Sequence, residues 1–270
     1  MGTETPAASA GHAAPQEAGT GSSGPPEVPP PPWQRLPERS SRRRREPISR
    51  DAIVDAAIAL LDRDGLDALS MRALAAQLGT GAASLYWHVG SKDGLLDLVL
   101  DKLIGEVTIP DADPERWQEQ VREVARNQRA VSLRHPYLVR VSIGRIPMGQ
   151  NAIRLSERTL AILRAGGLPP RMAVQGHLLL ISTINGFTLD ETGVGDPPGA
   201  QPDGAPTAAE AGEMASAYLR SLPPAHFPNL VELAGEYALT DDDARFGLLI
   251  DIFVDGLARA AASARPGAGG

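Results

Sequence analysis

Residues 70–92 hold a cluster of polar, basic and aromatic side chains whose chemistry suits contact with a nucleic acid. Arg72 can grip a guanine edge through two hydrogen bonds or pair with a phosphate. The hydroxyl of Tyr86 and the ammonium group of Lys92 suit phosphate oxygens. These side chains therefore predict noncovalent recognition of DNA rather than the making or breaking of bonds.

Two short helices separated by a turn are expected to carry these side chains. Ser70 can cap the first helix, whose leucines lie four residues apart on one face. Gly79 and Gly81 stand at the break, where glycine allows a positive φ. The second helix is expected over about 82–89, with its apolar residues directed inward. This layout is typical of a DNA-reading helix-turn-helix.

The composition allows one or two domains with a sizeable hydrophobic core, and it includes a local basic segment. The chain has 270 residues, 42% of them hydrophobic, and its net charge is −7. Positive charge is concentrated in the run Arg42–Arg45, which follows a Pro-, Ala- and Gly-rich stretch expected to be disordered. The absence of cysteine excludes disulfides and thiolate metal sites. No signal-peptide pattern is present, so we expect a cytoplasmic location.

Helical periodicity continues to the C-terminal end, without strand-type alternation. Helices are expected near residues 114–133, 137–144, 150–166, 169–192, 207–221, 227–238 and 241–263. Polar residues interrupt the apolar stretch 173–189, which predicts a core helix and no membrane span. The helix at 241–263 is apolar nearly all round, so either it lies at the centre of a monomer or it forms a dimer interface with the helix at 169–192.

Residues 69–92 resemble the TetR family of bacterial transcription regulators. The resemblance rests on Leu-Ser-Met-Arg at 69–72, Ala-Ala-Gln-Leu-Gly at 75–79, Leu-Tyr-Trp-His-Val at 85–89 and the lysine at 92. A looser resemblance to the tetracycline-repressor-type C-terminal domain includes Arg-His-Pro-Tyr-Leu at 134–138 and Gly-Phe-Thr-Leu-Asp-Glu at 186–191.

The resemblance implies an all-α protein with a three-helix helix-turn-helix DNA-binding domain and a C-terminal bundle for effector binding and dimerisation. We expect a tail at 1–46, the DNA-binding domain at 47–107 with its motif at about 69–89, the bundle at 108–263 and a tail at 264–270. The implied function is a homodimeric repressor that a small-molecule effector releases from a palindromic double-stranded operator.

DNA contacts are expected from the arginine run, the two motif helices and the start of the next helix. The candidates are Arg42, Arg43, Arg44, Arg45, Ser70, Arg72, Thr80, Gly81, Ala82, Ala83, Ser84, Tyr86, His88 and Lys92. Alternatively, the arginine run is a solvated tail and Arg72 contacts only phosphate. Trp87 is expected in the core, since a large ring closes a three-helix domain efficiently.

Polar residues near apolar helical faces could line an effector cavity. The candidates are Gln128, Ser142, Arg145, Gln175, His177, Thr183, Asn185 and Asp190, each with a plain structural role as its alternative. The resemblance to tetracycline-repressor-type domains implies that Arg145 stands near their metal-water contacts, where an arginine would repel a magnesium–drug chelate. We therefore expect neither tetracycline binding nor a required metal or other cofactor. The dimer interface is expected to contain Leu179, Phe246, Leu249, Ile250, Phe253 and Leu257.

Two other classes of function stay open at this stage. One is an enzyme built on a helical bundle, although the sequence has no Gly-rich phosphate loop, nucleophile motif or metal-ligand cluster that would mark a catalytic site. The other is an architectural DNA-binding protein that responds to no ligand. Activation of transcription, rather than repression, is also compatible with the sequence.

Overall fold

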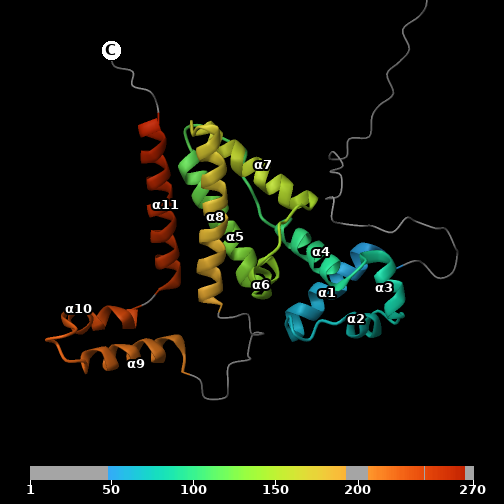
Figure 1. Ribbon diagram of the computed structural model, residues 1–270, viewed down its shortest axis with the longest axis horizontal. Helices are drawn as coiled ribbons and strands as arrows, with labels where there is room; N and C mark the ends of the chain where they lie inside the picture. Colours follow the sequence, from blue (N-terminus) through green and yellow to red (C-terminus); the bar gives the residue numbers. More distant parts are fainter. Residues whose placement is uncertain (1–47, 193–205, 240, 265–270) are drawn as a thin grey trace, which may run out of the picture.

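The computed structural model describes residues 48–192, 206–239 and 241–264, and every regular element within them is helical (Figure 1). This confirms the predicted all-α class. The arginine run and the predicted tails lie outside the described residues, except for Ala264, the first residue of the second predicted tail.

The N-terminal domain comprises α1 (Arg50–Asp64), α2 (Met71–Gln77), α3 (Ala82–Val89) and α4 (Lys92–Ile104). Serine hydroxyls cap three of these helices, and a serine before an apolar-periodic segment predicts each cap. Ser49 accepts from Ala52 N at 3.1 Å, Ser70 from Ala73 N at 3.1 Å and Ser91 from Gly94 N at 2.9 Å. The four helices share a core of fully buried aliphatic side chains: Ile53, Leu61, Leu74, Leu85, Leu95 and Val99.

The C-terminal bundle comprises α5 (Trp117–Arg134), α6 (Tyr137–Ser142), α7 (Gln150–Ala165), α8 (Pro170–Glu191) and α11 (Asp242–Ala264). Its core continues that of the N-terminal domain and includes Val121, Ile162, Leu163, Leu180, Ile184 and Phe246. By length and composition α8 could cross a membrane, but it packs against α5, α7 and α11 as a helix of a folded domain does.

A helical hairpin between α8 and α11 stands apart from the bundle (Figure 1). It is formed by α9 (Ala208–Arg220), α10 (Pro228–Glu232) and the 3₁₀ helix η1 (Ala234–Leu239). The single helix expected at 227–238 is therefore wrong, because the chain breaks into a short α-helix and a 3₁₀ turn at Leu233.

Candidate DNA-binding and effector-response sites

α3 is the second helix of the helix-turn-helix and the expected recognition helix, and it has one buried and one exposed side. Leu85 and Val89 lie four residues apart and are buried in the core. Tyr86 and Trp87 are 46% and 48% exposed. The expectation that Trp87 belongs to the core is therefore wrong, because a residue two positions from both Leu85 and Val89 points away from their face of the helix.

The other predicted DNA contacts surround this exposed side. Arg72 is exposed at the second position of α2, and Lys92 is exposed at the start of α4. The remaining motif residues are exposed or half-buried: Ser70, Thr80, Gly81, Ala82, Ala83, Ser84 and His88. The candidates of residues 70–92 therefore lie at or near the surface of α2, α3 and the start of α4, and α3 packs against both of the other helices.

Glycine has different roles at the two ends of the turn. Gly79 adopts a φ of 61°, which favours glycine, whereas Gly81 is the extended N-cap of α3 with a φ of −85°. Only the first of these positions needs a positive φ. Neither Gly81 nor its small neighbours Ala82 and Ala83 carries a hydrogen-bonding side chain, so this end of α3 can approach DNA only through its backbone and methyl groups.

Arg50 supports the recognition helix and was missed by the sequence reasoning. Its Nε donates to the backbone oxygen of His88 at 3.1 Å, in the last turn of α3. A cation at a helix C-terminus satisfies a free carbonyl and matches the helix dipole. Because the two residues are 38 positions apart, no local sequence signal indicates the contact.

The candidate effector residues do not form one group. Arg145 lies between the domains, where it forms ion pairs of 2.7 Å with Asp93 and with Asp97 of α4. Asp190 pairs with Arg245 at 3.2 Å, and Gln175 is exposed. These three positions therefore do not support the expected lining of a cavity inside the bundle.

His177 is the strongest remaining effector candidate. It is buried on α8, and its Nε2 lies 3.2 Å from Ser156 Oγ of α7. Its Nδ1 has no hydrogen-bond partner among the described residues, and burial lowers the pKa of its imidazole. Four other candidates are half-buried, namely Gln128, Ser142, Thr183 and Asn185, and the Ser142 hydroxyl donates locally to Val139 O.

The residues proposed for the dimer interface also divide into two groups. Phe246 and Ile250 are buried within the subunit, so a partner could cover little more of them, and they are corrected to core residues. Leu249, Phe253 and Leu257 are half-buried. The apolar side chains left exposed on the adjacent helices α8 and α11 are Val174, Leu178, Leu179, Leu248 and Ile252. Of the predicted set, Leu179 is the one that lies in this exposed group.

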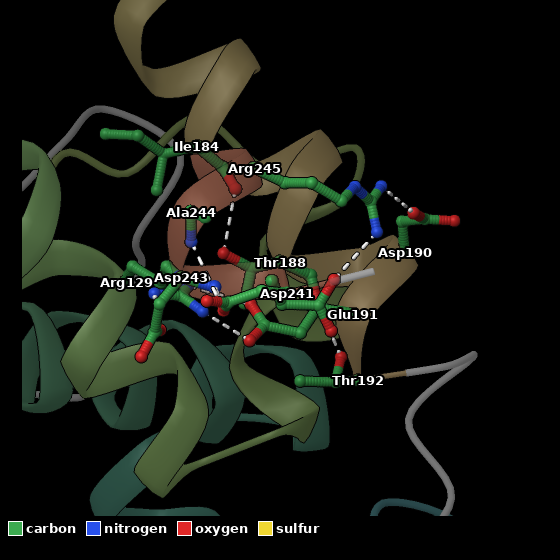
Figure 2. A network of polar contacts seen from close by, with 11 residues as sticks. Arg129, Ile184, Thr188, Asp190, Glu191, Thr192, Asp241, Asp243, Ala244 and Arg245 are labelled. Atoms are coloured by element: carbon green, nitrogen blue, oxygen red, sulfur yellow. Dashed lines mark hydrogen bonds and ion pairs between the residues drawn. The ribbon is translucent and has the colours of Figure 1, made fainter. Parts of the chain in front are cut away.

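A buried arginine joins three helices of the bundle (Figure 2). The Arg129 guanidinium of α5 donates to both carboxylate oxygens of Glu191 at the end of α8, and to Asp243 at the start of α11 at 2.7 Å. It also lies over the ring of Phe246, 4.9 Å from the centroid. The hydrogen bonds that Arg129 donates to the Glu191 carboxylate raise the pKa of Arg129, so the guanidinium stays charged. Sequence reasoning missed it because its partners are distant in the chain.

Both domains match family models. Residues 53–99 match the tetR family of bacterial regulatory proteins, and residues 109–261 match the tetracyclin repressor-like C-terminal domain. An HTH-type transcriptional regulator of Saccharopolyspora erythraea is 43% identical over 135 residues, which cover 50% of this chain and 56% of the relative. The transcriptional repressor DrrR1 of Streptomyces coeruleorubidus is 35% identical over 149 residues, 55% of each chain. The chain thus spans just over half the length of these two relatives.

Solved structures extend the likeness to about four fifths of the chain. The TetR family protein ActR of Streptomyces coelicolor, in complex with actinorhodin, superposes with a TM-score of 0.74 at 43% identity. The match covers 81% of this chain and 99% of ActR. Apo ActR gives a TM-score of 0.72 at 42% identity, with the same coverage. The helix-turn-helix, the bundle and these matches together confirm the predicted fold and regulatory class, and the chain belongs to the TetR family of bacterial transcriptional regulators.

Proposed function

We propose that this chain is a homodimeric transcriptional repressor of the cytoplasm that binds a palindromic operator and leaves it when a small molecule binds the bundle. The observation that carries the proposal is the exposure of Tyr86 and Trp87 on α3 together with that of Arg72 on α2, the helix that packs against α3. Exposed aromatic side chains on a short helix cost free energy in water unless a partner covers them. The major groove is wide enough to accept such a helix.

Features of both the helix-turn-helix and the bundle support a dimer. Two copies of a helix-turn-helix related by a twofold axis read two half-sites of a palindrome. The exposed leucines and isoleucine of α8 and α11 supply an apolar face for the partner copy, and these two helices run side by side along the bundle (Figure 1). We therefore place the dimer interface at Val174, Leu178, Leu179, Leu248 and Ile252.

For the effector, we propose a small organic molecule that enters the bundle near His177. The unpartnered Nδ1 of this buried imidazole can accept or donate one hydrogen bond to a ligand. ActR, which is 43% identical, has been solved with actinorhodin, so actinorhodin is the first probe to test here. Tetracyclines are not proposed, because Arg145 and Asp190 pair with protein groups.

The test begins with selection of bound duplexes from a random DNA library by the full chain. Arg72→Ala should weaken binding to the selected duplex by about 1–3 kcal/mol and relax the preference at one base pair per half-site. Tyr86→Phe should weaken binding equally on all sequences, since it removes a phosphate contact. Arg171→Ala is the matched control, because Arg171 is exposed at the second position of α8 as Arg72 is in α2.

Different outcomes separate the repressor from its alternatives. If no duplex is enriched, or if neither Arg72→Ala nor Tyr86→Phe changes the affinity for DNA, the proposed DNA-binding function is wrong. If a duplex is bound but no compound of a library that includes actinorhodin releases it, the ligand-independent DNA-binding protein is favoured. If the chain raises transcription from a reporter promoter that contains the selected duplex, the chain is an activator.

A further inference from the structure

The last helix of the DNA-binding domain carries an acidic face that a single short segment of the bundle engages. Asp93, Asp97 and Asp101 follow one another at intervals of four residues on α4, so they lie on one side of the helix. All three accept hydrogen bonds from residues 145–152, which comprise the end of the α6–α7 connection and the first turn of α7.

Arg145 holds the N-terminal end of the acidic face. Its Nη2 donates to the Asp93 carboxylate at 2.7 Å and its Nη1 to the Asp97 carboxylate at 2.7 Å. The same Nη1 reaches the backbone oxygen of Asp93 at 3.2 Å. One planar guanidinium therefore fixes the first two turns of α4 in both position and direction, which a point charge could not do.

The start of α7 holds the other end of the acidic face. The Asp101 carboxylate accepts from the backbone N–H groups of Asn151 and Ala152, both at 3.0 Å, and so caps α7 from another domain. The approach is close at this point, because a Cβ at Gly149 would lie 2.1 Å from Cγ of Asp101. The two anchors are eight residues apart, about 12 Å along the helix axis.

The recognition helix is attached to the end of α4 that Arg145 holds. α3 ends at Val89, and a Cβ at Gly94 would lie only 2.4 Å from the Val89 backbone oxygen. The first turn of α4 therefore packs directly against the last turn of α3. A shift of this turn relative to the bundle must displace α3 as well.

From these contacts we infer that Arg145 is a positioning residue. It acts through α4 on α3 and so fixes the angle between the bundle and the helix pair α2–α3, which we call the reading head. Without Arg145, directional bonds from the bundle still hold the domain at Asp101, Glu106 and Asp62. The N-terminal end of α4 would then keep only nondirectional apolar contacts, over which it can tilt. This inference rests on the proposed function for its biological meaning, but the contacts themselves do not depend on it.

The first experiment measures the angle directly and needs neither DNA nor effector. Because the chain has no cysteine, Ala59→Cys on α1 and Glu157→Cys on α7 give one spin-label pair across the two domains. Labelled chain is mixed with an excess of unlabelled chain, so that each dimer holds at most one pair. Electron-spin distance measurements should give a narrow distribution for the native arginine and a broad or shifted one for Arg145→Gln and for Asp97→Asn.

Arg122→Gln is the matched control within the bundle. The Arg122 side chain is 21% exposed, the same as that of Arg145, and it also pairs with two aspartates, Asp251 and Asp255. Its loss should leave the distance distribution narrow. Arg145→Lys keeps the positive charge but lacks the planar, paired N–H donors of the guanidinium, so its distance distribution should have an intermediate width. An unchanged distribution in Arg145→Gln and Asp97→Asn, or equal broadening in Arg122→Gln, overturns the inference.

The second experiment connects the angle to DNA binding. On the selected duplex, Arg145→Gln should bind about fivefold or more weakly, within the usual range of coupling between two sites, while Arg122→Gln binds as the native chain does. Equal affinities of Arg145→Gln and the native chain would show that the angle does not matter for binding. If the native chain binds no duplex, the proposed function fails, and the distance measurement still decides whether Arg145 positions the head.

Discussion

The hydroxyl of Tyr137 donates a hydrogen bond of 2.9 Å to the carboxylate of Asp62 and so joins α6 of the bundle to α1 of the DNA-binding domain. The same carboxylate oxygen lies 2.8 Å from Nδ1 of His135, whose Nε2 is 3.7 Å from Glu106. Tyr137 is buried, and its burial is the main reason that the pKa of its phenol lies above the ordinary 10.0. The hydrogen bond to Asp62 raises this pKa further. The phenol therefore stays protonated over the physiological range.

Tyr137→Phe should lower the free energy of unfolding by about 1.5 kcal/mol, because it removes a hydrogen bond to a charged acceptor and keeps the ring. The raised pKa adds a pH signature. Stability from the protonated phenol is fully present below pH 10 and is lost as pH rises above 10, where the unfolded chain ionises first. Urea titrations at pH 7 and pH 10.5 should show a smaller alkaline loss in the variant. Equal losses would contradict the assigned environment of Tyr137.

His177 should make the protein sensitive to acid. Burial lowers its pKa below the ordinary 6.5, so the folded state keeps the imidazole neutral while the unfolded chain takes up a proton. Its stability contribution is present above pH 6.5 and is lost as pH falls through the lowered pKa. His177→Gln should therefore lose less stability than the native chain between pH 7.5 and pH 5.5 in urea titrations. Parallel losses would show that His177 does not titrate on unfolding.

The Arg129 cluster is expected to be the largest single ionic contribution to the bundle. Arg129→Met should lower the free energy of unfolding by about 3 kcal/mol, because it leaves the largely buried Glu191 carboxylate without its partner. Arg245→Met is the control from the same network (Figure 2), since its pairs with Asp190 and Asp242 are exposed and worth about 0.5 kcal/mol or less each. Similar losses in both variants, measured by urea unfolding, would mean that burial does not set the strength of these pairs.

The revised dimer interface predicts which apolar positions tolerate a charge. Ile252→Asp should give a monomer in light scattering after gel filtration, because association would bury an unpaired carboxylate. Leu133→Asp, at an exposed leucine of α5, should remain dimeric. A stable dimer that persists in both Ile252→Asp and Leu179→Asp would place the interface elsewhere.

The sequence allowed prediction wherever local rules decide the structure. Serine caps at positions 49, 70 and 91 and the apolar spacing within each helix are local, and the helices before residue 192 begin and end within about three residues of the expected positions. What could not be predicted depends on the spatial arrangement of distant helices. Arg145 was assigned to an effector site because its aspartate partners are 48 and 52 residues away. Phe246 and Ile250 were assigned to the dimer because composition does not show which side of an apolar helix faces its own subunit.

Trp87 gives the most direct test of the reading head, because its exposure contradicts its expected place in the core. Trp87→Ala should weaken binding to the selected duplex by about 1 kcal/mol, the usual contribution of one aromatic contact beyond its area. Its melting temperature should match that of the native chain, since half of the ring already contacts water. Tyr218→Ala, at an exposed aromatic residue of α9, should change neither property. If Trp87→Ala lowers the melting temperature and binds DNA with native affinity once corrected for folded protein, the ring supports the fold and does not contact DNA.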